Sequence, residues 1–150
     1  MNVKGAKNGA AFERELVSGE ASAEDFKTRL AFLQPLPTSD KWKYKGKTVT
    51  LIDERAISQS EHTGLFLEAA CATTFIGSQT AGANGDVTNL TLPGGLLVGF
   101  TGHDVRHVDG RKLQRVGLAP QVEVRPTLAG IGAGKDEVLA RALEYLRDGK

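Results

Sequence analysis

The sequence predicts an α/β fold, and three observations support this class. Short apolar runs rich in β-branched residues, such as 49–52, alternate with longer segments that have helical periodicity. The chain has 150 residues, 40% of them hydrophobic, which is enough to form the core of one globular domain. Helix start and stop signals separate the runs, so each predicted element has boundaries of its own.

Residues 1–40 are expected to form a leader and one helix ahead of the main domain, which covers residues 41–150. The first 20 residues are rich in Gly, Lys and Glu and predict a weak helix or a loosely held leader. A capping-box-like start at Ser22 predicts a helix that Pro35 ends. Its apolar face would consist of three residues at helical spacing, Phe26, Leu30 and Leu33.

The main domain is predicted to alternate strands and helices. In order, the elements are a strand over 47–52, a helix over 59–72, a strand over 73–76, a hairpin from 87–92 and 96–101, a strand over 122–124 and a helix over 135–148. The first strand is apolar at successive positions, as expected for a strand covered on both faces. A Pro-Gly-Gly turn joins the hairpin, and the last helix has one apolar face and a glycine stop at Gly149.

The composition argues against several classes of function. A net charge of +1 gives no reason to expect nucleic acid or an anionic membrane surface as partner, and no apolar run approaches the roughly 18 residues of a membrane span. The single cysteine, Cys71, excludes an intrachain disulfide and is expected to be a small buried hydrophobe.

No metal or cofactor site is predicted. The three histidines do not form an H-E-x-x-H pattern, and His103 and His107, although four apart, read as part of a hairpin. The glycine-rich loop 77–85 is not a phosphate-binding P-loop, because Ala83 stands where a lysine would follow Gly82.

Ser58 is the most informative residue of the chain. The apolar run that ends at Ile52 breaks off, and Ser58 then opens a helix. A hydroxyl at such a corner lies beside backbone N–H groups without helical partners, as a serine nucleophile with an oxyanion hole requires. The same residues satisfy a capping box, in which Ser58 accepts the N–H of Glu61 and contributes about 1 kcal/mol. Because the G-x-S-x-G signature is absent, the residues alone leave both interpretations open.

From about residue 45 to 146, the chain resembles the C-terminal half of the catalytic domain of C-terminal processing (tail-specific) serine proteases, especially their tricorn-like relatives. Each matching block is weakly specific, but their order and spacing over roughly two-thirds of the chain are distinctive. The blocks are Val49–Glu54, Ser58–Glu61, Ile76–Gly85, Leu92–Gly95, Asp109–Gly110, Gln114–Val124 and Lys135–Leu146.

The resemblance implies a fold and a set of site residues. The fold would be part of a crotonase/Clp-like spiral of ββα units. By position, Ser58 corresponds to the nucleophile, the N–H of Gln59 to one oxyanion donor, and Gln114 to a glutamate that assists the base in the tricorn-like branch. Ala83 occupies the position of the lysine in the Ser-Lys branch, so that mechanism is excluded. The second oxyanion donor comes from an earlier glycine-bearing segment that has no match here.

The general base also has no match in this sequence. In the tricorn-like branch a histidine from the first half of the domain acts as base, so the chain is expected to be a fragment that lacks that half. His62, four residues after Ser58, is an alternative base, although a packing role fits it better. Since a positioned base contributes about 10²–10⁴-fold and one oxyanion donor about 3 kcal/mol, the isolated chain should hydrolyse peptides very slowly.

Three functions follow from these observations. The first is a serine endopeptidase that acts on polypeptides, with no cofactor. The second is a non-catalytic peptide-binding or assembly module, for which Ala83 and Gln114 are signs of lost catalysis. The third, acyl-CoA binding, rests only on the analogy of folds. The resemblance also implies a periplasmic or extracellular location in a bacterium, and a homo-oligomer is possible, although the N-terminus lacks the apolar core of a secretion signal.

Overall fold

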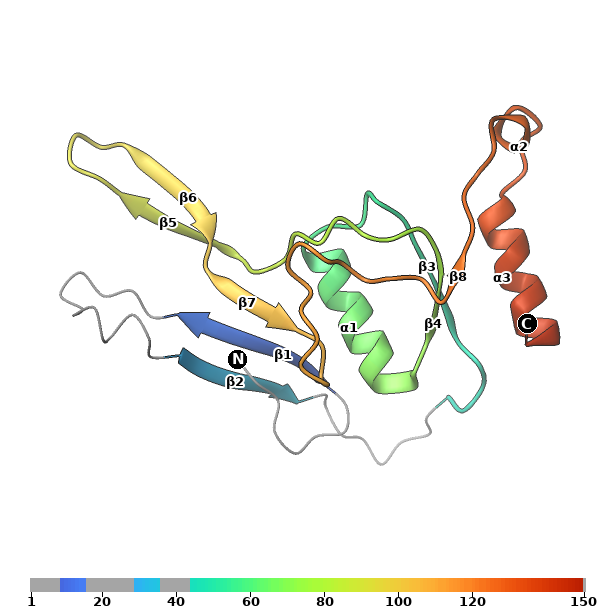
Figure 1. Ribbon diagram of the computed structural model, residues 1–150, viewed down its shortest axis with the longest axis horizontal. Coiled ribbons are helices and arrows are strands. Elements are labelled where there is room, and N and C mark those ends of the chain that lie inside the picture. The colour runs from blue at the N-terminus through green and yellow to red at the C-terminus, as the bar shows by residue number, and fades with distance from the viewer. Residues whose placement is uncertain (1–8, 16–28, 36–43, 150) are drawn as a thin grey trace.

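The computed structural model describes residues 9–15, 29–35 and 44–149, and it has the mixed α/β character expected from the sequence (Figure 1). Its elements in chain order are β1 (Gly9–Glu15), β2 (Arg29–Pro35), β3 (Val49–Ile52), α1 (Gln59–Cys71), β4 (Thr74–Gly77), β5 (Val87–Thr91), β6 (Leu97–Thr101), β7 (His103–Arg106), β8 (Val122–Glu123), α2 (Leu128–Gly132) and α3 (Glu137–Asp148).

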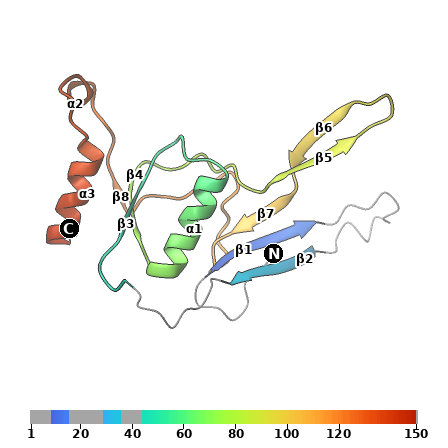
Figure 2. The ribbon, with the colours of Figure 1, turned by 180° about the vertical axis from the view of Figure 1, so that it is seen from behind.

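A small parallel sheet with the order β3-β4-β8 lies between α1 and α3 (Figures 1 and 2). One face of this sheet carries Phe75 toward α1, and the other face carries Thr74, whose hydroxyl lies 3.2 Å from the hydroxyl of Tyr145 on α3. Elements therefore lie on both faces of the sheet, but β3 itself is only partly buried, since Ile52 is buried and Leu51 is 43% exposed; the expectation that this strand is covered on both faces is wrong for Leu51.

The apolar core lies between α1 and the face of the sheet turned toward it. It consists of six residues from several elements, Ile52, Leu65, Phe75, Val105, Leu113 and Leu118. Five of them are at most 1% exposed and are large, which places most of the hydrophobic stabilisation here.

Gly77 brings the carboxyl ends of β3 and β4 together. Its φ is +134°, and a Cβ at this position would collide with the carbonyl oxygen of Ile52. The chain segments that leave these two strands, 53–58 and 78–85, therefore start side by side. They carry the residues of the candidate site.

An antiparallel sheet with the order β2-β1-β7 replaces the helical leader expected at the N-terminus. The predicted helix is wrong for Leu30 and Leu33, which lie in β2, and the weak helix over 1–20 is wrong where β1 runs. Phe26 lies outside the described residues. β1 pairs with β2 along seven residues and with β7 on its other side. This pairing overrides the local helical spacing of three apolar residues.

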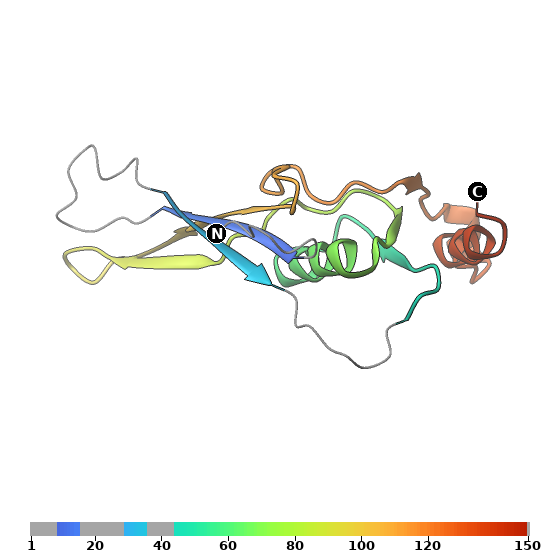
Figure 3. The same ribbon diagram turned by 90° about the horizontal axis from the view of Figure 1, so that it is seen from below.

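The predicted hairpin is present as β5 and β6, which form a two-stranded ribbon that projects from the body (Figures 1 and 3). Residues opposite each other in an antiparallel pair share a face. One face of the ribbon therefore carries five large apolar side chains, each between 38% and 62% exposed: Leu90, Leu92, Leu96, Val98 and Phe100. No residue from 87 to 101 is charged.

The C-terminal half of α1 is held by a charged cluster. Glu68 contacts Nδ1 of His107 at 2.6 Å and the guanidinium of Arg111 at 2.8 Å, and His107 is 4% exposed. Burial raises the pKa of the Glu68 carboxyl, but its hydrogen bonds and attraction to His107 and Arg111 outweigh burial and hold that pKa below its ordinary value.

Replacing Glu68 with glutamine should therefore make stability less dependent on pH in the acid range. A lowered carboxyl pKa contributes stability that is full above the unfolded-state pKa of about 4.3 and is lost as pH falls through the folded-state pKa. We expect Glu68→Gln to lower the free energy of unfolding by about 1–3 kcal/mol at pH 7. Urea titrations from pH 7 to pH 2 should show this deficit shrinking toward low pH, and a deficit that is constant with pH would contradict the assignment.

Within the described residues, no helix is long and apolar enough to cross a bilayer.

Candidate active site

Ser58 occupies a strained corner between β3 and α1. Its backbone has φ 53° and ψ −113°, in a region that residues with a side chain rarely adopt, and α1 begins at the next residue. Such strain costs on the order of 1–3 kcal/mol, and it concentrates at functional sites. The residue is exposed, so its hydroxyl is accessible from solvent.

Ser58 does not cap α1 through its side chain, although it stands at the N-cap position. The capping-box interpretation is therefore wrong for both partners. An N-cap residue normally has an extended backbone, from which its oxygen reaches the N–H groups of the first turn, whereas Ser58 has positive φ. Its own N–H donates to the carbonyl of Ala83 at 3.0 Å instead of to the Glu61 carboxylate.

The N–H of Gln59 lies at the start of α1 and donates to no group of the described residues. The neighbouring backbone N–H groups both have partners: Ser58 N–H donates to the carbonyl of Ala83, and Ser60 N–H donates to the carbonyl of Ile57 at 3.1 Å. Gln59 thus presents an open N–H beside the Ser58 hydroxyl, at the positive end of a 13-residue helix.

Glu61 lies in the first turn of α1 and is fully buried, at 0% exposure. Its carboxylate accepts the hydroxyl of Thr80 and the N–H of Gly82, both at 2.6 Å, and the N–H of Ala83 at 3.0 Å. Reasoning from the sequence missed this role, because the spacing to Ser58 suggested only a capping box. No local pattern reveals a contact between residues that are 19 to 22 positions apart.

Gln114 lies on the other side of the same loop. Its Oε1 accepts the N–H of Asn84 at 3.1 Å. The structure therefore brings Ser58 and Gln114 to adjacent residues of one loop, Ala83 and Asn84. The side-chain nitrogen of Asn84 is buried and has no hydrogen-bond partner in the described part of the chain, which is an uncommon feature.

The histidines occupy positions that tie them to other groups. The ring of His62 packs edge-on against Phe66 at 4.9 Å between ring centres, and burial lowers the pKa of its imidazole. Nδ1 of His103 lies 3.2 Å from Asp86, and His107 binds Glu68. Across the described ranges, no three His, Cys, Asp or Glu side chains gather as metal ligands.

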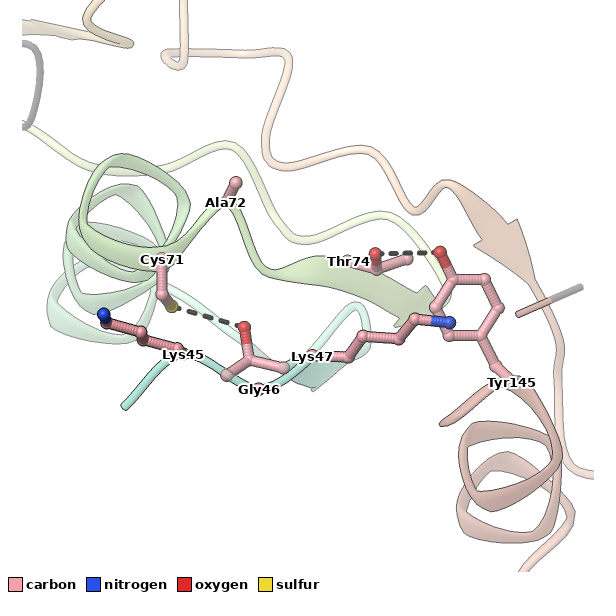
Figure 4. A pocket seen from close by; sticks show the side chains of 8 residues that line it. Lys45, Gly46, Lys47, Cys71, Ala72, Thr74 and Tyr145 are labelled. Carbon is pink, nitrogen blue, oxygen red and sulfur yellow. Dashed lines mark hydrogen bonds between the residues drawn. The ribbon is translucent and has the colours of Figure 1, made fainter. Parts of the chain in front are cut away.

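A cavity of about 270 Å³ lies at the opposite end of α1 (Figure 4). Cys71 and Ala72 line it together with Lys45 and Lys47, and Figure 4 shows the Lys47 side chain extending toward Tyr145. Because α1 has 13 residues, this cavity is about 20 Å along the helix from Ser58. Cys71 is exposed there, so the expectation that it is buried is wrong.

The model of peptidase family S41 matches residues 5–124. Among solved structures, a candidate peptidase from Parabacteroides merdae ATCC 43184 is 23% identical, with a TM-score of 0.65. Mature CPAF in complex with lactacystin is 22% identical, with a TM-score of 0.62. The alignments cover 79% and 85% of this chain but only 36% and 24% of those proteins. At this identity the likeness shows a shared fold, and no curated protein matches the sequence significantly.

Proposed function

We propose that this chain, which belongs to peptidase family S41, forms part of a serine endopeptidase acting on polypeptides. The resemblance noted in the sequence is thus confirmed at the level of the family. We further infer that residues 41–150 are the C-terminal half of a catalytic domain with a crotonase/Clp-like spiral of ββα units. Residues 1–40 would belong to the preceding part of that domain.

The observation that carries this proposal is the conformation of Ser58. A serine with positive φ, an exposed hydroxyl and no capping bond has no evident structural reason to be held in this way. A strained strand-to-helix turn is how several hydrolases present a nucleophilic hydroxyl. The open N–H of Gln59 beside it is where an oxyanion donor is needed.

In this mechanism Ser58 Oγ attacks the scissile carbonyl carbon, and its proton passes to a general base. The N–H of Gln59 donates to the oxyanion that forms, and the leaving amine takes the proton as the C–N bond breaks. Water then hydrolyses the acyl-enzyme. Gln114 cannot serve as a carboxylate, and the described histidines are engaged elsewhere. We therefore propose that the base comes from the part of the domain that these residues do not include, and that the isolated chain is nearly inactive.

The proposal is tested by covalent labelling. A fluorophosphonate should modify the complete protein, which includes the part that supplies the base, and peptide mapping by mass spectrometry should place the adduct on Ser58. Ser60 provides the matched control, because it lies two residues away on the first turn of α1 and is also exposed. We expect Ser60→Ala to be labelled as fast as the native chain. An adduct on Ser60, or equal labelling of both serines, would refute the assignment.

A second candidate function is supported by Gln114. Its carboxamide oxygen is already bound to the Asn84 N–H, and Ala83 supplies no amine, which suits a peptide-binding or assembly module that kept the fold and lost the chemistry. This alternative predicts no labelling at Ser58 even after the complete protein is tested.

A further inference from the structure

We propose that Glu61 is a positioning residue of the candidate active site: its buried carboxylate joins the loop 80–83 to the first turn of α1 and so holds Ser58 in its strained conformation. The inference rests on the proposed function, because it concerns the geometry of the same serine. It assigns to Glu61 no contact with substrate.

The hydrogen bonds of Glu61 require two acceptor oxygens, as a carboxyl group provides and a carboxamide does not. All three of its partners donate: the Gly82 N–H, the Ala83 N–H and the Thr80 hydroxyl. The direction of the last bond follows from Leu118, whose N–H donates to the same Thr80 oxygen at 2.7 Å and leaves the hydroxyl proton for Glu61. A carboxamide could not accept all three, because its nitrogen would face a backbone N–H.

Two further bonds connect this loop directly to the serine segment. Ser58 N–H donates to Ala83, and Ala81 N–H donates to the carbonyl of Ala56, both at 3.0 Å. The loop fixed by Glu61 is therefore the same loop that holds the backbone on both sides of Ile57. A residue kept at positive φ needs such external restraint, because its own preferences favour relaxation.

The segment that carries Gln114 is tied to the same loop. Arg115 N–H donates to the carbonyl of Gly82 at 2.6 Å, and Leu118 exchanges two hydrogen bonds with Thr80. Glu61 thus stands at the junction of three segments, which carry Ser58, Ala83 and Gln114. Of these three residues, only Ser58 is close to Glu61 in the sequence.

The test compares two matched pairs of variants in the complete protein, which includes the part that supplies the base. Glu61→Gln is set against Glu68→Gln, a partly buried carboxylate on the same helix whose partners are remote from Ser58. Thr80→Val, which cannot donate a hydrogen bond to Glu61, is compared with Thr80→Ser, which keeps the hydroxyl. Labelling rates at Ser58 are measured well below each melting temperature, together with hydrogen exchange of the Ser58 N–H, with the Ala72 N–H as reference.

A displacement of about 1 Å at a reacting atom lowers a rate by about 10²-fold. We expect Glu61→Gln and Thr80→Val to slow labelling at least about tenfold and to speed exchange of the Ser58 N–H by a similar factor, because both follow from loss of the loop restraint. Glu68→Gln and Thr80→Ser should stay within about threefold of the native chain in both measurements. These factors would hold whatever each variant does to the melting temperature.

Other results overturn the proposal. If Glu61→Gln changes neither labelling nor exchange, or if Glu68→Gln slows labelling and speeds exchange by the same factors, Glu61 contributes only general stability. If the native chain is not labelled at Ser58, the proposed function fails, and the exchange of the Ser58 N–H decides the positioning role alone. Faster exchange in Glu61→Gln then supports it, and unchanged exchange refutes it.

Discussion

Ser58→Ala is expected to abolish labelling of the complete protein by a fluorophosphonate, while the melting temperature stays within about 2 °C of the native value. The hydroxyl makes no capping bond, so removing it costs little stability. The variant should keep the same strained backbone conformation, because the hydrogen bond from the N–H of residue 58 to the carbonyl of Ala83 does not involve the side chain. In a complete serine protease, loss of the nucleophile lowers kcat by about 10⁶-fold.

Labelling and thermal unfolding together separate the two roles of this serine. If Ser58 were only a cap, alanine would cost about 1 kcal/mol, which is roughly 2–4 °C for a chain of this size, and the labelling pattern would not change. Labelling that survives the substitution would remove Ser58 from the chemistry. The same preparation of the native chain, unfolded before labelling, shows that the reagent needs the folded site.

The Phe75→Ala variant should show the largest loss of stability. Phe75 is 1% exposed on β4 and packs among the apolar side chains between the sheet and α1. Truncating such a ring costs about 3–5 kcal/mol, which is a large part of the 5–15 kcal/mol that stabilises a typical domain. Urea unfolding followed by circular dichroism measures the difference.

Leu128→Ala serves as the control for this experiment, because Leu128 is 90% exposed on α2. Its free energy of unfolding should change by less than about 0.5 kcal/mol. A small loss in Phe75→Ala, comparable to that of the control, would contradict the placement of the core between α1 and β4.

Elements with strong local signals were predicted well. The apolar run of β3, the Pro-Gly-Gly turn of the β5–β6 hairpin and the amphipathic pattern of α3 each appear where expected, with boundaries that differ by one to two residues. Gly149 ends α3 in a left-handed conformation, as the sequence predicted, and the structure adds a cap at the other end, where Asp136 accepts the Leu139 N–H.

Elements that depend on distant partners were not predictable. Leu30 and Leu33 have helical spacing, yet β2 forms because β1 lies between it and β7, which is some 70 residues away in the sequence. The exposure of Cys71 depends on what packs near the end of α1, and its apolar neighbours in sequence do not reveal this. Non-local pairing decides such cases, and a local pattern contains no information about it.

For the candidate site, the family resemblance predicts Ser58, Gln59 and Gln114 as site residues but does not give their arrangement. The positive φ of Ser58 could not be foreseen, because no glycine or asparagine marks the position. The burial of Glu61 could not be foreseen either, since glutamate is almost never fully buried without partners and its partners come from a loop twenty residues on.

The β5–β6 ribbon exposes apolar side chains whose burial would be favourable. Each of the five apolar side chains on its one face keeps a large share of its surface in water, and full burial of such a side chain releases about 1.5–3 kcal/mol. Half of that amount, taken over five residues, is on the order of 5 kcal/mol. With no charge between 87 and 101 to be desolvated, very little would oppose the release of this energy when water leaves that face.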